Sequence, residues 1–219
     1  CHRDADVMLM HMRSELAGTY VFRNGSAEKL DTKTDLTMSA LVYPYWHDSG
    51  KYVTFSVNNT NQVLHASDPN RIEVFDEDSD VVVYDVEGHE VVTSGLLASE
   101  TAFETFPTFS PDGRSLYFCS SKAVAPMPER YKEVRYSLCR VDFDPDDCSF
   151  GSVTDTLYNA EVSGGSVSFP RVSPDGRFLV FTLSGYGNFS IWHKDADLHC
   201  IDLQVGSVSR IDTVNSEDV

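Results

Sequence analysis

The 219-residue sequence predicts an all-β fold of repeated, stacked sheets, and three observations support this prediction. First, a pattern of an aromatic residue, proline, a tight turn and an apolar strand occurs three times. Its prolines are Pro44, Pro107 and Pro170, so the two intervals, 107 − 44 and 170 − 107, are equal. Second, every turn contains glycine, and third, every following strand carries apolar residues two apart. A constant period indicates one supersecondary unit copied along the chain, with a core shared between neighbouring copies.

The strand after each turn is apolar on both faces. Phe55, Phe118 and Phe181 occupy equivalent positions, each two residues after another apolar residue. That spacing places both side chains on one face of a strand. The alternate positions are also largely apolar or aromatic. Such strands are typical of the middle of stacked sheets, so we expect the three phenylalanines in the core.

The turn itself is Ser-Pro-Asp-Gly in copies two and three. Proline is favoured at the second position of a type I turn and glycine at the fourth. Copy one carries a degraded version without proline, His47-Asp48-Ser49-Gly50. Glycine is present in all three copies, as expected where φ must become positive to enter the next strand.

Two more strands follow each hairpin. The third strand is expected to start at Asp80, Ser137 and Asp197, and a weaker fourth strand near 89–97, 150–157 and 208–214. Four antiparallel strands per repeat is the blade of a β-propeller, which is the fold class that we predict. A sandwich of unrelated strands would not repeat with a constant period. The expected blades cover about 39–98, 102–160 and 165–214.

The N-terminal part completes the predicted organisation. Residues 17–32 form a hairpin pattern on Asn24-Gly25, which indicates a partial blade over 17–38, after an N-terminal segment 1–16. Propellers usually close with four to eight blades, and three blades cannot form a ring. We therefore interpret 17–219 as a fragment of a larger ring, or a processed form. The alternative is a three-blade chain that closes by oligomerising.

Composition narrows the expected partners. The formal charge is 17 − 34 = −17, and an acidic surface repels phosphate backbones, so we expect no nucleic acid partner. No apolar run reaches the 18 or more residues of a membrane span, so we expect a chain that does not cross the membrane.

The string Pro-x-φ-Ser-Pro-Asp-Gly-[Lys/Arg]-x-φ-x-Phe, followed by a φ-x-φ-Asp-φ strand, resembles the WD-like repeats of TolB-type propellers over about residues 39–214. The stretches 43–47, 103–109 and 186–197 are similar to a TolB-like family of cell-envelope proteins from Bacteroidetes-type bacteria. The resemblance implies a propeller that is periplasmic or associated with the outer membrane. It does not imply a particular reaction.

Cys1-His2 matches the end of Cys-x-x-Cys-His, the motif of covalent c-type haem attachment. The family named above carries such a motif ahead of its propeller, so the resemblance implies haem binding by Cys1 and His2. A second axial ligand would come from the run 8–12, in which Met8, Met10, His11 and Met12 stand. The alternatives are a lipid-anchored Cys1 or a fragment boundary, and a strand or helix at 8–12 that packs on the propeller.

A binding face is predicted from the connections between second and third strands. These connections hold the extra length of the repeat, at 58–79, 122–135 and 185–196, and antiparallel order places all three on one face. Insertions on one face usually mark the binding face. The densest polar–aromatic cluster there, and our predicted ligand site, is Tyr186, Trp192, His193, Lys194 and Asp195. Alternatively, Trp192 packs on the next blade.

No catalytic residues and no metal ligands are predicted. The acidic runs Asp76–Asp80 and Asp144–Asp147 do not follow the ligand spacing of an EF-hand, so solvated turns are expected. The chain has no Gly-x-Ser-x-Gly elbow and no helix–strand alternation. Cys119 and Cys139 could face each other, but we expect buried free thiols.

These observations lead to one functional hypothesis and two alternatives. The first is a non-enzymatic envelope scaffold that presents its loop face to a protein or glycan partner. The alternatives are a c-type haem electron-transfer protein supported by the propeller, and the propeller domain of a prolyl-peptidase-like hydrolase. Three intact repeats without a shared polar catalytic set favour binding, because turn and core chemistry is what repeats.

Overall fold

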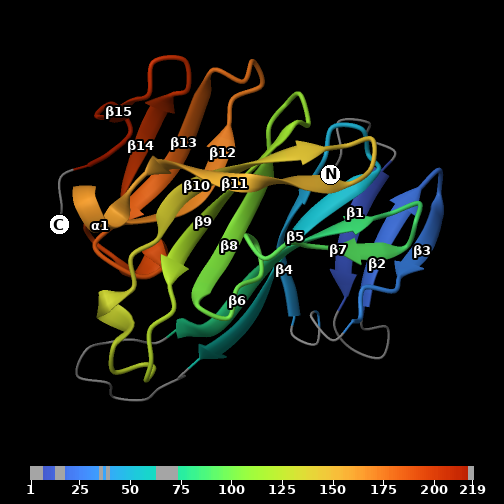
Figure 1. Cartoon of the computed structure of the whole chain (residues 1–219), viewed down its shortest axis with the longest axis horizontal. Helices are drawn as coiled ribbons and strands as arrows, with labels where there is room; N and C mark the ends of the chain where they lie inside the picture. Colours follow the sequence, from blue (N-terminus) through green and yellow to red (C-terminus); the bar gives the residue numbers. More distant parts are fainter. Residues whose placement is uncertain (1–6, 13–17, 35–36, 38–39, 63–73, 217–219) are drawn as a thin grey trace.

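The computed structural model describes residues 7–12, 18–34, 37, 40–62 and 74–216. The fold is all-β: four antiparallel sheets follow one another in chain order, from β1–β3 at one end of the molecule to β12–β15 at the other (Figure 1). Within each sheet, strands that are consecutive in the chain lie side by side. This meander of stacked sheets is the predicted propeller-type architecture.

The first sheet contains β1 (Val7–Met12), β2 (Gly18–Arg23) and β3 (Ser26–Leu30). Blade 1 contains β4 (Ala40–Trp46), β5 (Tyr52–Gln62), β6 (Val74–Asp85) and β7 (Glu90–Val92). Blade 2 contains β8 (Ala102–Phe109), β9 (Ser115–Lys122), β10 (Ser137–Asp144) and β11 (Ser149–Tyr158). Blade 3 contains β12 (Ser166–Val172), β13 (Phe178–Ser184), β14 (Asp197–Asp202) and β15 (Ser207–Arg210).

Short helices lie in the connections of the described blades: η2 (Tyr131–Glu133) and η3 (Ser190–Trp192) between second and third strands, and α1 (Ala160–Ser163) between blades 2 and 3. The run 8–12, considered above as a source of haem ligands, lies in β1 and pairs with β2. The first sheet therefore begins within the segment 1–16 and includes the hairpin on Asn24-Gly25.

Blade 1 differs from the prediction at its second connection. Asn58–Gln62 and Val74–Ser79 continue the β5–β6 ladder, so much of the expected insertion 58–79 is strand. The strand β6 starts six residues before the predicted Asp80. The expectation of a solvated turn at Asp76–Asp80 is wrong for Asp76, whose side chain is 2% exposed. The acidic turn at Asp144–Asp147 is largely exposed, as expected.

The core is divided between neighbouring sheets, as the repeat predicts. Phe55 packs between the first sheet and blade 1, Phe118 between blades 1 and 2, and Phe181 between blades 2 and 3. All three are fully buried. Cys119 and Cys139 point to opposite faces of blade 2 and are free thiols, and burial raises the pKa of Cys139 to about 11.

The three turns share one hydrogen bond and one glycine conformation. Gly50, Gly113 and Gly176 each donate to the carbonyl three residues earlier and have φ between +70° and +72°. The degraded turn of copy one has an additional contact. The His47 ring is buried, contacts Ser49 through Nδ1, and places Nε2 3.0 Å from the Gly113 carbonyl of blade 2. Copy one therefore links two blades.

The aromatic residue before each repeat proline adopts a conformation that the sequence did not predict. Tyr43, Phe106 and Phe169 all have φ of +53° to +54°, which is rare for a bulky side chain. Each lies at a β-bulge of the first strand of its blade. The three rings meet, with centroids 4.2, 4.5 and 5.7 Å apart. This ring contact offsets backbone strain of about 1–3 kcal/mol per residue.

Candidate binding site

Four of the five predicted site residues lie on η3 or directly after it, and the fifth, Tyr186, precedes it in the same connection. The Tyr186 and His193 rings meet edge to face with centroids 4.4 Å apart. The Nδ1 atom of His193 lies 3.7 Å from Oδ1 of Asp195. The structure therefore brings these three together, as predicted, while Lys194 is exposed beside them.

The histidine of this cluster is held by its neighbours. Burial lowers the pKa of His193, and the nearby Asp195 carboxylate opposes that shift. This shift favours the neutral imidazole, whose ring contacts Tyr186. It packs against the tyrosine, while Asp195 is open to solvent.

Blade 2 contributes two residues from the connection 122–135, which is on the predicted binding face, but neither is among the predicted ligand-site residues. The Tyr131 ring packs edge to face on Tyr186 at 5.9 Å, and the Lys132 Nζ lies 5.9 Å from the Tyr186 ring centroid. The cluster thus spans the loops of two blades. No local feature of the sequence marks Lys132, because the ring that it contacts belongs to the next blade.

Two large apolar side chains of η3 point into solvent. Ile191 is 87% exposed and Trp192 is 55% exposed. Within the described part of the chain, Trp192 is therefore not a core residue of a neighbouring blade, which was the alternative interpretation. Ile191 could have been noticed in the sequence as an apolar residue inside a polar connection.

A buried polar network lies under the loop face. Asp76 on β6 accepts hydrogen bonds from Asn58 Nδ2 (2.7 Å), Asn188 Nδ2 (2.5 Å) and Thr60 Oγ1 (2.5 Å). Tyr131 donates through its hydroxyl to Asn188 Oδ1 at 3.0 Å. Asp76 and Asn188 are 112 residues apart, so the network joins blade 1 to the connections of blades 2 and 3.

The electrostatics of the network depend on these bonds. Burial raises the pKa of Asp76, and the bonds from Thr60, Asn188 and Asn58 oppose that shift by stabilising the carboxylate. Removing one amide would leave a buried carboxyl group short of a partner, which is costly. The network therefore links β5 and β6 of blade 1 to the second connections of blades 2 and 3.

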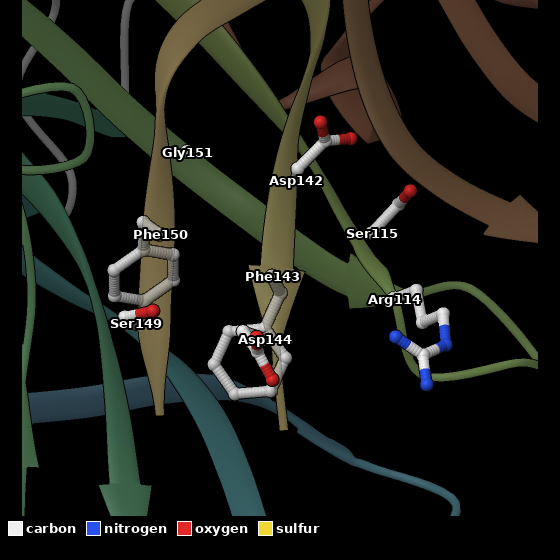
Figure 2. A pocket seen from close by; sticks show the side chains of 8 residues that line it. All are labelled: Arg114, Ser115, Asp142, Phe143, Asp144, Ser149, Phe150 and Gly151. Atoms are coloured by element: carbon white, nitrogen blue, oxygen red, sulfur yellow. The ribbon is translucent and has the colours of Figure 1, made fainter. Parts of the chain in front are cut away.

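A depression separate from this cluster lies at the turns of blade 2, on the face opposite to the loops that carry the cluster. Its volume is about 450 Å³, and Figure 2 shows the side chains that line it. It is lined by Arg114, Ser115, Asp142, Phe143, Asp144, Ser149, Phe150 and Gly151. Figure 2 shows Arg114 and Asp142 extending in different directions, with Ser115 between them. No motif in the sequence indicated a site here.

The remaining predicted site residues, Cys1 and His2, lie outside the described residues, and haem attachment there stays a prediction. Within the described ranges, no group of three or more His, Cys, Asp or Glu side chains could hold a metal ion. In the same ranges, no helix is long and apolar enough to cross a membrane.

The stacked four-stranded sheets define a β-propeller-type chain, and solved structures share this fold. A protein described as TolB from Agrobacterium tumefaciens is 17% identical, with a TM-score of 0.60 over 94% of this chain and 61% of that one. A Mycobacterium tuberculosis puromycin-hydrolyzing peptidase is 13% identical, with a TM-score of 0.57 over 96% and 30%. An oligogalacturonate lyase in complex with manganese is 14% identical, with a TM-score of 0.52 over 89% and 41%.

These likenesses concern the fold, which non-enzymes and enzymes share. The chain spans about three fifths of the TolB structure and about two fifths of the lyase. No protein-family model matches the sequence, and no curated protein does.

Proposed function

We propose that this chain is a non-enzymatic scaffold of the cell envelope that binds a partner protein through its loop face. The contact surface consists of Ile191, Trp192, Tyr186 and Lys132. The observation that carries the proposal is the exposed pair Ile191–Trp192 on η3, on loops that the buried network holds in place.

The chemistry of the surface favours protein over glycan. Tryptophan is enriched among the residues that dominate protein–protein binding energy, and it acts from the centre of an apolar patch with a polar rim. Ile191 enlarges the patch, and Lys132, Lys194 and Asp195 are the charged groups around it. A sugar ring would stack on the tryptophan but would gain little from an exposed isoleucine.

Rigidity of the surface supports the same role. A partner that binds a fixed loop loses less conformational entropy than one that must order it. The hydrogen bonds from Asn188 to Asp76 and from Tyr131 to Asn188 anchor both sides of the surface in buried structure. Trp192 is thus presented on an ordered base.

The location is part of the proposal. The repeat pattern resembles TolB-type propellers, and the TolB structure shares the fold. Both support a periplasmic or outer-membrane-associated protein. The Bacteroidetes-type origin rests on the sequence resemblance alone.

The test is cross-linking in envelope extract with three forms of the protein. A double variant, Ile191→Ser with Trp192→Ser, should lose the cross-linked partner that the wild type captures. Val205→Ser is the matched control, since Val205 is similarly exposed and apolar but lies at a turn of the same blade, on the opposite face. Equal capture by the double variant would overturn the proposal. If the wild type bound a glycan array and the double variant did not, the face would be assigned to sugar binding instead.

A further inference from the structure

The depression at the turns of blade 2 is lined by an arginine and an aspartate whose equivalents form an ion pair in blade 3. In blade 3, Arg177 donates from Nε and Nη2 to Oδ2 of Asp202, at 3.2 and 3.0 Å. The equivalent residues of blade 2 are Arg114 and Asp142. Among the residues that the structure describes, neither of these side chains forms a salt bridge, although Asp112 interacts electrostatically with Arg114 and Arg140 with Asp142.

The equivalence of the two pairs is structural. Arg114 and Arg177 are one repeat period apart, and each directly follows the turn glycine. In both blades the residue after the aspartate donates its backbone N–H to the arginine carbonyl, at 2.9 Å in blade 2 and 2.8 Å in blade 3. The same residue types at the same backbone positions therefore form a pair in one blade and not in the other.

The difference comes from the length of the third strand. In blade 3, β14 ends at Asp202, which also caps the next turn by accepting from the Gln204 N–H. In blade 2, β10 continues to Asp144, and Asp144 caps the turn by accepting from the Asp146 N–H. Asp202 both pairs with the repeat arginine and caps the turn, whereas Asp142 does neither.

Glycine keeps the released space open. Gly151 lies across from Asp142 on β11, and a Cβ at position 151 would lie 3.3 Å from the Asp142 Cβ. A side chain there would crowd Asp142. The half-buried Phe150 ring adds an apolar wall, and Ser115 and Ser149 add hydroxyl groups to the lining.

From this arrangement we infer that the depression binds the zwitterionic end groups of a short peptide. Arg114 offers a planar, bidentate partner for a carboxylate, and Asp142 accepts hydrogen bonds from an ammonium group. The site has one cation and two carboxylates within a chain of net charge −17, so a purely anionic ligand is disfavoured. The volume of about 450 Å³ is in the range of small-molecule sites and accommodates a dipeptide, whose apolar side chain would contact Phe150.

The test uses L-alanyl-L-phenylalanine and two capped forms, N-acetyl-Ala-Phe and Ala-Phe amide, titrated into the ¹⁵N-labelled chain. Free Ala-Phe should shift the amide resonances of the lining residues with a Kd of about 1 mM, as expected for an open, solvated site. Each cap should weaken binding at least about fivefold, because it removes one of the two charges.

Variants assign the two charges. Arg114→Gln should abolish the preference for free Ala-Phe over Ala-Phe amide. Asp142→Asn should abolish the preference for free Ala-Phe over N-acetyl-Ala-Phe. Arg177→Gln is the matched control: it breaks the equivalent pair of blade 3 and should leave binding unchanged. Because Arg114 and Asp142 are exposed, both variants should fold, which thermal unfolding checks. Equal binding of capped and free dipeptides, or no shift of lining residues up to about 20 mM, would overturn the inference.

Discussion

The interface between blades 1 and 2 and the interface between blades 2 and 3 are built from the same repeat but differ in chemistry. Ser56 and Glu104 belong to the first, and Cys119 and Val167 occupy the equivalent positions of the second, one repeat period later. All four side chains are buried. The repeat therefore preserves strand geometry and core phenylalanines, while other buried positions make each interface chemically distinct.

The polar interface also holds titratable groups. Ser56 donates to Thr105 of blade 2 at 2.9 Å, and burial raises the pKa of Glu104 to about 8, with the Asp80 charge adding to the shift. Burial and the charge of Asp78 raise the pKa of Asp80 to about 6. Blade 1 thus meets blade 2 through groups whose protonation changes near neutral pH, whereas blade 3 meets blade 2 mainly through apolar side chains.

The largest expected effect tests what the interfaces share. Phe118→Ala and Phe181→Ala should each lower the free energy of unfolding by about 3–5 kcal/mol, since each leaves a cavity in a closely packed core. Urea unfolding measures both, with the exposed Val153→Ala as the control. A much smaller effect at Phe118 would mean that the polar interface does not depend on its apolar part.

The second prediction tests what differs. The folded-state pKa of Glu104 is raised, so the folded protein holds a proton that the unfolded chain releases above about pH 4.5, and stability falls as pH rises to about 8. Glu104→Gln should remove on the order of 2–4 kcal/mol of that fall. Urea unfolding at pH 5 and pH 8.5 measures it. The exposed Glu161→Gln should keep the wild-type pH dependence, and an unchanged slope in Glu104→Gln would contradict the assignment.

The smallest expected effect compares two turns. Gly113 and Gly176 have nearly the same positive φ, but a Cβ on Gly113 would clash with the His47 ring, whereas nothing described lies within 4 Å of one on Gly176. Gly176→Ala should cost about 1 kcal/mol, and Gly113→Ala about 1–3 kcal/mol more. Thermal unfolding measures the difference.

A double variant checks the cause of this difference. Because the excess at Gly113 comes from the His47 ring, His47→Ala should reduce the cost of Gly113→Ala to that of Gly176→Ala. If the two glycine variants have equal melting temperatures, the contact between the turns does not contribute to the first interface.

The sequence predicted what depends on near neighbours. The alternating pattern around Phe118 and Phe181 and the turn chemistry before them are local, and they were sufficient for the fold class. The sequence groups Tyr186, His193 and Asp195 because they belong to one connection.

What escaped prediction depends on residues far apart in the chain. The sequence predicts a solvated Asp76 because its partner Asn188 is 112 residues away. Arg114 and Asp142 do not pair because the third strand of blade 2 continues two residues further than that of blade 3. A repeat pattern shows what the blades share and does not show such a difference. Cys1-His2 and its haem interpretation remain a prediction from sequence.

The bond between Asn188 and Asp76 has a consequence for the order of folding. Closing a contact over 112 residues carries a large loop-closure entropy, so it becomes favourable only after the intervening blade has formed and brought both ends together. The loop face should therefore be completed late, when all three blades are in place. A partner that recognises Trp192 on its anchored loop would then distinguish finished molecules from folding intermediates.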